Sequence, residues 1–232
     1  MNLSDFSVVS TNVEVDSQSQ LIKKTYSLNV TLGITTFEVK GLMDNYLSSL
    51  RSSNIAIPEV TNSYVQDEKI VYECHFCGQN IVELGLTVSN FEEFEPFIRE
   101  MSCMVNKAIL GDVYFDPHPK NFVFNTRGDI FYVDFFPPYS DYLKSKRLEV
   151  ALDSEKQIIT ENYAFFTRDF LAAHFCGDFL NIDPMFESSF HKIYAIVHDL
   201  GMFGGSLSDF VTLAKKIRHT EDTRIARNIY LL

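Results

Sequence analysis

The stretch VYFDPHPKNFVFNTRGDIFYVDFF, residues 113–136, contains the pattern that decides the fold. It begins with a compact loop that carries two prolines and runs from Asp116 to Asn121. An apolar run at 122–124, a turn and a second apolar run then predict a β-hairpin that ends at Asp134. Because an antiparallel hairpin brings the outer ends of its strands together, we expect Asn121 and Asp134 to lie side by side.

Asp116, Asn121 and Asp134 are the residue types that phosphoryl transfer requires. The reaction needs a carboxylate that orients the acceptor hydroxyl, and oxygen ligands for a Mg²⁺ ion that neutralises charge on the nucleotide phosphates. Asn121 follows Asp116 by five positions, which is the spacing of the catalytic Asp and the metal-binding Asn in the kinase signature H-R-D-x-x-x-x-N. The spacing therefore favours a site for phosphoryl transfer.

The two segments Asp116-Pro-His-Pro-Lys-Asn121 and Val133-Asp134-Phe135 resemble the D-x-H-P-x-N and D-F motifs of aminoglycoside/choline-type phosphotransferases. The loop is also similar to the D-P-H-P-G-N loop of the UbiB-like atypical kinases. Both groups share the protein-kinase-like fold. The resemblance therefore implies a bilobed α+β protein, with a β-rich N-lobe and a mainly helical C-lobe, that uses ATP and Mg²⁺.

The same resemblance implies a role for each polar residue of the motif. Asp116 would be the catalytic base, and Asn121 and Asp134 would bind Mg²⁺. His118 matches a structural position of the loop, and we expect it to brace the loop by hydrogen bonds rather than to transfer protons. Lys120 replaces the usual small residue, and it either reaches a phosphate or lies in solvent.

The chain on either side of the loop predicts the same order of elements. β-branched and aromatic runs, a helix that begins near Thr36 and a later strand hairpin make up an N-lobe over residues 1–80. A helix capped by Ser89 and ended by Gly111 opens a C-lobe over residues 81–232. Apolar residues recur at helical spacing through most of the last third of the chain.

A kinase-like N-lobe also needs a strand lysine for the α- and β-phosphates and a helix Glu that holds it. The run Leu21-Ile22-Lys23-Lys24 predicts that strand. Its two lysines must point to opposite faces, so only one can face the nucleotide. Lys23 is the first choice and Lys24 the second. Glu38, in the first turn of the predicted helix, is the favoured partner, and Asp44 is the alternative.

Three departures from the family pattern keep other functions open. The first glycine is Gly33, after the lysine strand, so no glycine-rich phosphate loop precedes that strand. Tyr114 stands two residues before Asp116, where the kinase signature has His, and Phe136 stands where that signature has Gly. One alternative is therefore a pseudokinase that binds nucleotide or a protein partner without phosphoryl transfer. Another is transfer of AMP from the same cleft.

The charge of the chain narrows the class of partner. The sequence has 20 Lys and Arg against 31 Asp and Glu, a formal net charge of -11, with no basic stripe for a phosphate backbone. We therefore expect no nucleic-acid partner, and the acidic balance favours a cationic small molecule as hydroxyl acceptor. No signal peptide and no apolar run long enough for a membrane helix is recognisable, so the sequence predicts a cytoplasmic protein without a membrane partner.

Overall fold

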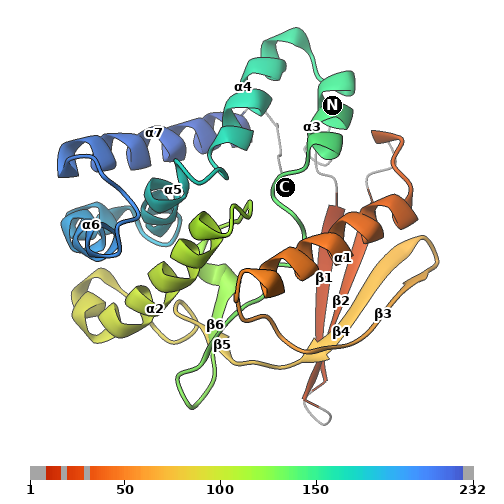
Figure 1. Cartoon of the computed structure of the whole chain (residues 1–232), viewed down its shortest axis with the longest axis horizontal. Helices are drawn as coiled ribbons and strands as arrows, with labels where there is room; N and C mark the ends of the chain where they lie inside the picture. The colour runs from red at the N-terminus through yellow and green to blue at the C-terminus, as the bar shows by residue number, and fades with distance from the viewer. Residues whose placement is uncertain (1–8, 17–19, 29–31, 227–232) are drawn as a thin grey trace.

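The computed structural model describes residues 9–16, 20–28 and 32–226, which form a sheet-containing part followed by a helical part (Figure 1). The first part comprises β1 (Val9–Asp16), β2 (Leu21–Leu28), α1 (Thr36–Ser52), β3 (Val60–Gln66) and β4 (Lys69–His75). The second part contains α2 (Phe91–Leu110), α3 (Asp141–Val150), α4 (Asp153–Ala164), α5 (Leu171–Asp178), α6 (Phe190–Asp199) and α7 (Leu207–Ala226). The predicted α+β class and the predicted order of a sheet part before a helical part are confirmed.

The first sheet has four antiparallel strands in the order β1-β2-β4-β3. Strand β2 is therefore central, and Lys24 lies across from Val13 on one side and Tyr72 on the other. Helix α1 packs on this sheet through Val39, Met43 and Leu47, which are among its buried residues (Figure 1). The sheet and α1 together hold the lysine strand rigidly in the centre of the first part.

Helix α1 begins where the sequence predicts, and its start is set by a capping box. The Thr35 side chain accepts a hydrogen bond from the Glu38 backbone N–H, and the Glu38 carboxylate accepts one from the Thr35 backbone N–H at 2.8 Å. This reciprocal pair satisfies two of the amide groups that a helix N-terminus otherwise leaves without partners. The Glu38 carboxylate therefore stabilises the N-terminus of α1.

Helix α2 begins one residue later than the prediction that Ser89 would cap it. A short 3-10 turn at Val88–Asn90 precedes the helix, and Asn90 is its N-cap residue. The Asn90 side chain accepts from the Thr87 backbone N–H at 2.7 Å, so the local hydrogen bonds favour the turn at Ser89. Gly111 follows the last helical residue, as the sequence predicts.

A second, three-stranded sheet joins the two parts in the order β5-β6-β7. It consists of β5 (Gln79–Asn80), β6 (Phe122–Phe124) and β7 (Ile130–Tyr132), and β6 and β7 form the predicted hairpin. Gly78 enters this sheet with a φ of +122, and a Cβ there would lie 1.8 Å from the Phe124 carbonyl oxygen. Only glycine allows this crossing, so the chain changes from the first sheet to the second at Gly78.

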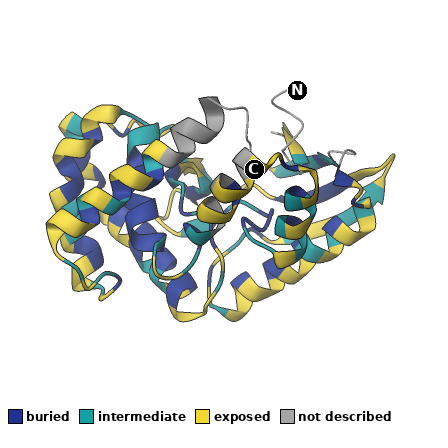
Figure 2. Ribbon diagram, turned by 90° about the horizontal axis from the view of Figure 1, so that it is seen from above, coloured by how far each residue is buried: buried dark blue, intermediate teal, exposed yellow. Residues whose placement is uncertain are grey.

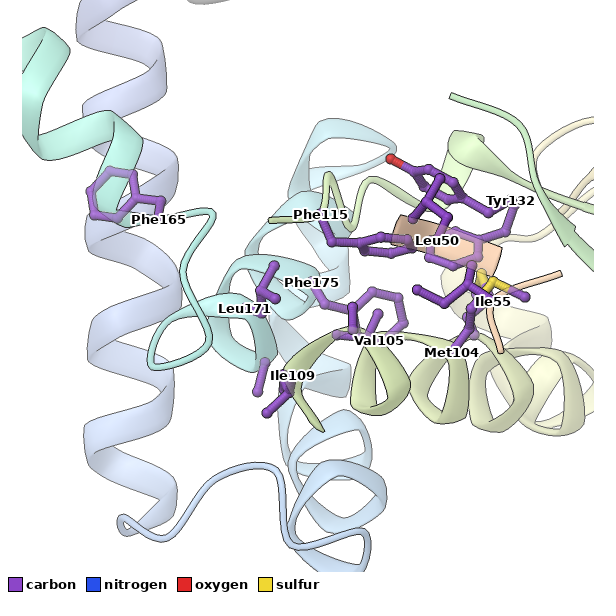
Figure 3. Close-up of a cluster of buried hydrophobic side chains, with 14 of the residues drawn as sticks. Leu50, Ile55, Met104, Val105, Ile109, Phe115, Tyr132, Phe165, Leu171 and Phe175 are labelled. Carbon is purple, nitrogen blue, oxygen red and sulfur yellow. The ribbon is translucent and has the colours of Figure 1, made fainter. Parts of the chain in front are cut away.

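One continuous apolar core extends from the first sheet to the last helix. Buried residues line the inward faces of the helices, and exposed residues lie on their outer faces (Figure 2). Figure 3 shows Leu50 of α1, Met104 of α2, Tyr132 of β7 and Phe175 of α5 in this cluster. Among residues 9–16, 20–28 and 32–226, no helix is both long and apolar enough to cross a membrane.

Phe122, at the start of the hairpin, tests how far stability depends on this core. Its ring is fully buried and lies 5.8 Å from Phe115 and 6.4 Å from Phe175, centroid to centroid. Because truncation would leave a cavity between closely packed rings, we expect Phe122→Ala to lower the free energy of unfolding by about 3–5 kcal/mol in urea titrations.

Phe37 is the matched control, because its side chain is 75% exposed at the start of α1. Phe37→Ala should change the free energy of unfolding by no more than about 0.5 kcal/mol. Equal losses in the two variants would contradict the placement of Phe122 in the core.

Candidate functional site

The loop from Asp116 to Asn121 is held by its own polar groups. The His118 backbone N–H donates to Asp116 Oδ1 at 3.1 Å, and the His118 ring Nδ1 accepts from the Lys120 backbone N–H at 3.1 Å. The Asn121 side-chain amide donates to the Asp116 carbonyl at 3.5 Å. His118 therefore braces the loop, and the Lys120 side chain is exposed to solvent.

The hairpin brings Asn121 and Asp134 together as the sequence predicts. The Val133 backbone N–H donates to the Asn121 carbonyl at 2.8 Å, and Phe122 pairs with Tyr132 in the β6-β7 register. Asp134 follows directly, and its Oδ1 accepts from the Phe136 backbone N–H at 3.1 Å. The loop end and the hairpin end are thus neighbours, each with its side chain positioned by the backbone.

Lys24 reaches this site from the first sheet. Its side chain is 8% exposed, its ammonium donates to the Val133 carbonyl, and it lies 4.6 Å from the centre of the Phe135 ring. Burial lowers the pKa of Lys24, and the negative charge of Asp134 acts in the opposite direction. The structure therefore brings a lysine of β2 to the residues on either side of Asp134.

Lys23, the first choice from the sequence, points elsewhere. It lines a surface cavity with Glu14 and Glu73, on the other face of β2 from Lys24. The two lysines do take opposite faces, as strand geometry requires. The order of preference is reversed, because the sheet buries the face that carries Lys24.

Neither predicted carboxylate partner joins Lys24. Glu38 is tied to Thr35 in the capping box and accepts from the Tyr142 hydroxyl at 3.0 Å. Asp44 accepts from the Tyr72 hydroxyl at 2.6 Å and from Lys40 at 2.7 Å. The pairing of Lys24 with α1 is therefore absent in this structure, because both acids have other partners.

Three buried tyrosines around Asp134 were not anticipated from the sequence. Tyr26 lies on β2, Tyr46 on the buried face of α1 and Tyr132 on β7, and the Tyr46 hydroxyl donates to the Tyr132 hydroxyl at 3.3 Å. Burial raises the pKa of all three well above the usual range, and the charge of Asp134 raises it further. The helical spacing of apolar residues in α1 predicts that Tyr46 is buried. It does not predict the contact with Tyr132, because that residue lies in a distant segment of the chain.

Asp134 is strongly perturbed by this environment. Burial first, and then the negative charge of Asp116, raise the pKa of Asp134 to about 7. The Phe136 N–H and the Lys24 ammonium only partly offset this rise. Near neutral pH the carboxyl group therefore exchanges readily between its neutral and ionised forms.

The donor set fits a magnesium ion that is completed by phosphate oxygens. Mg²⁺ is usually held by one or two carboxylates together with waters and substrate phosphates, rather than by a full protein cage. Asn121 uses its amide nitrogen for the loop hydrogen bond, so its amide oxygen would be the atom that serves as a second protein ligand with Asp134. In the described part of the chain, no three His, Cys, Asp or Glu residues cluster as a cation site.

No family model matches the chain, and no curated protein matches its sequence. The positions of Lys24, Asp116, Asn121 and Asp134 are therefore the basis on which a function is proposed.

The pKa of Asp134 predicts that Mg²⁺ binding depends on pH. Only the ionised carboxylate is a good ligand, so binding must displace the proton that the raised pKa retains. With a pKa of about 7, we expect the Mg²⁺ affinity, measured calorimetrically with a nucleotide present, to rise about tenfold between about pH 6 and pH 8.

Two variants separate this effect from general titration of an acidic chain. Asp134→Asn should remove both the metal binding and its pH dependence. Asp199→Asn changes an exposed acid of α6 and should leave both unchanged. A pH-independent affinity in the unmodified protein would contradict the assignment of Asp134 as a ligand.

Proposed function

We propose that the chain is an ATP- and Mg²⁺-dependent phosphotransferase with a protein-kinase-like fold, acting on a hydroxyl of a small molecule. The observation that carries the proposal is the meeting of Lys24, from the first sheet, with the hairpin peptide next to Asp134. Lys24 is buried, and removing its ammonium group from water costs free energy that an anionic ligand would offset. The position of Lys24 and Asp134 beside the Asp116 loop supports a nucleotide phosphate site.

Each residue has a role that follows from its chemistry. Asn121 and Asp134 would hold Mg²⁺, which when bound supplies positive charge to the phosphate oxygens. The Lys24 ammonium has three N–H donors, so it would bind a phosphate oxygen while it keeps its hydrogen bond to the Val133 carbonyl. Asp116 is oriented through Oδ1 by the His118 N–H, so its second oxygen can accept the proton of the acceptor hydroxyl.

The acceptor is proposed from charge alone. With a formal net charge of -11, the chain attracts cations and repels anions over distances of about a Debye length. A small molecule that carries both a hydroxyl and a positive charge is therefore the favoured acceptor class.

Asp116→Asn tests the proposed base. Asparagine can still accept from the His118 N–H, so the loop should keep its shape, but it cannot take up a proton from the acceptor. We expect ADP formation, measured with water or an added hydroxyl compound as acceptor, to fall by about 10²–10⁴-fold. Mg·ATP affinity should change less than about twofold, because the base contacts the acceptor rather than the phosphates.

Asp199→Asn on the exposed surface of α6 serves as the control for loss of one negative charge. Undiminished ADP formation in Asp116→Asn would show that Asp116 is not the base.

Lys24→Met and Lys23→Met form a matched pair on adjacent positions of β2. Methionine keeps most of the apolar stem of lysine and removes only the charge. We expect Lys24→Met to weaken Mg·ATP binding by about tenfold or more and Lys23→Met to leave it unchanged, as measured by calorimetry. Indistinguishable affinities would refute the assignment of the phosphate-binding lysine.

A pseudokinase is the second candidate, and one observation favours it. Glu38 and Asp44 are hydrogen-bonded to residues other than Lys24, whereas an active protein kinase needs its strand lysine paired with a helix Glu. A chain that binds Mg·ATP with Lys24 and Asp134 but forms no ADP with any acceptor would support this alternative.

A further inference from the structure

A surface cavity of about 400 Å³ lies between the C-terminal half of α1 and two loops. The first loop, at 111–114, leads into Asp116, and the second, at 137–140, follows Asp134. A cavity of this size can hold a ligand of one or two rings. It is therefore flanked by both segments that carry the candidate phosphotransfer residues, although neither Asp116 nor Asp134 lines it.

Uncharged polar groups and aromatic rings dominate the wall of this cavity. Helix α1 contributes the side chains of Asn45, Ser48 and Ser49, and other hydroxyl groups come from the same helix and from residue 140. Tyr114 and Tyr139 stand opposite α1 with their ring centres 4.0 Å apart, and the Tyr114 side chain is 39% exposed. The ligand would thus meet hydroxyl and amide groups on one side and an open aromatic surface on the other.

The charges around the cavity exclude an anionic ligand. Among the residues that the structure describes, its lining contains one carboxylate, Asp112, and no Lys, Arg or His. A phosphate or carboxylate buried against these groups would have no cationic partner, and the cost of its lost hydration would not be offset. The nucleotide site and this cavity are therefore chemically different.

Tyr46 lies next to both the cavity and the candidate phosphotransfer residues. Its side chain lines the cavity, and its hydroxyl donates to Tyr132 on the side that faces Asp116 and Asp134. Tyr46 is buried, and neither Asp116 nor Asp134 is among the residues that line the cavity. The lining of the cavity is thus distinct from the candidate phosphotransfer residues.

We propose that this cavity binds a small uncharged ring compound with several hydroxyl groups, of the size of a monosaccharide or a cyclitol. Such a molecule offers an apolar ring face to Tyr114 and hydroxyl groups to the serines and Asn45. Multiple hydrogen bonds to neutral groups, with no charge to desolvate, suit this class better than any ion. The proposal does not depend on phosphoryl transfer.

Saturation-transfer difference NMR on the full chain, with myo-inositol and D-glucose as separate probes, tests this assignment. A ligand of this size in an open cavity should bind with a dissociation constant on the order of 1 mM. Ser49→Leu places a larger apolar side chain at an exposed lining position, and it should weaken binding by about tenfold or more. Ser188→Leu, at an exposed serine outside the cavity lining, is the matched control and should bind as the unmodified protein does.

D-glucose 6-phosphate separates this class of ligand from anions. Any binding of D-glucose 6-phosphate should be the same in Ser49→Leu as in the unmodified protein. The described lining of the cavity has no cation for its phosphate group, so the compound should not bind there. The proposal is overturned if neither neutral probe binds, if Ser49→Leu and Ser188→Leu bind them equally, or if the phosphorylated sugar binds in the cavity as well as glucose. Since no nucleotide is present, these outcomes are independent of the ADP measurements on Asp116→Asn.

Discussion

Both backbone polar groups of Val133, its N–H and its carbonyl, are hydrogen-bonded, and the arrangement of the candidate site depends on these two bonds. Its N–H donates to the Asn121 carbonyl, and its carbonyl accepts from the Lys24 ammonium. The first bond joins the loop to the hairpin, and the second joins the hairpin to the four-stranded sheet. One residue, Val133, thus connects the loop, the hairpin and the first sheet.

Asp134 experiences a balance of opposing charges that follows from this arrangement. The Lys24 ammonium favours its ionised form, whereas burial and Asp116 favour the neutral form and dominate. The surrounding tyrosines are buried, and their raised pKa values keep them neutral. The pair of carboxyl groups therefore lacks enough positive charge from the chain, and a metal ion would supply it.

Much of the fold could be predicted from local patterns. The helix at α1 and the hairpin of β6 and β7 follow from apolar spacing and turn residues, which act within a few positions of each other. The start of α2 was misplaced, because Thr87 and Asn90 form a competing turn around Ser89. The order of these elements was enough to predict the α+β class. The strand order of the first sheet was not predictable in this way, because β2 pairs with β4 and α1 lies between them in the sequence.

For the site, the sequence by itself determined Asp116, Asn121 and Asp134, because a loop of fixed spacing and a short hairpin bring them together through local geometry. Only the tertiary structure decided which of Lys23 and Lys24 reaches them, since alternation along a strand does not say which face the rest of the chain buries. It also decided that Tyr46 meets Tyr132 and that Tyr142 meets Glu38. These contacts join residues whose sequence separation carries no local signal, so packing alone determines them.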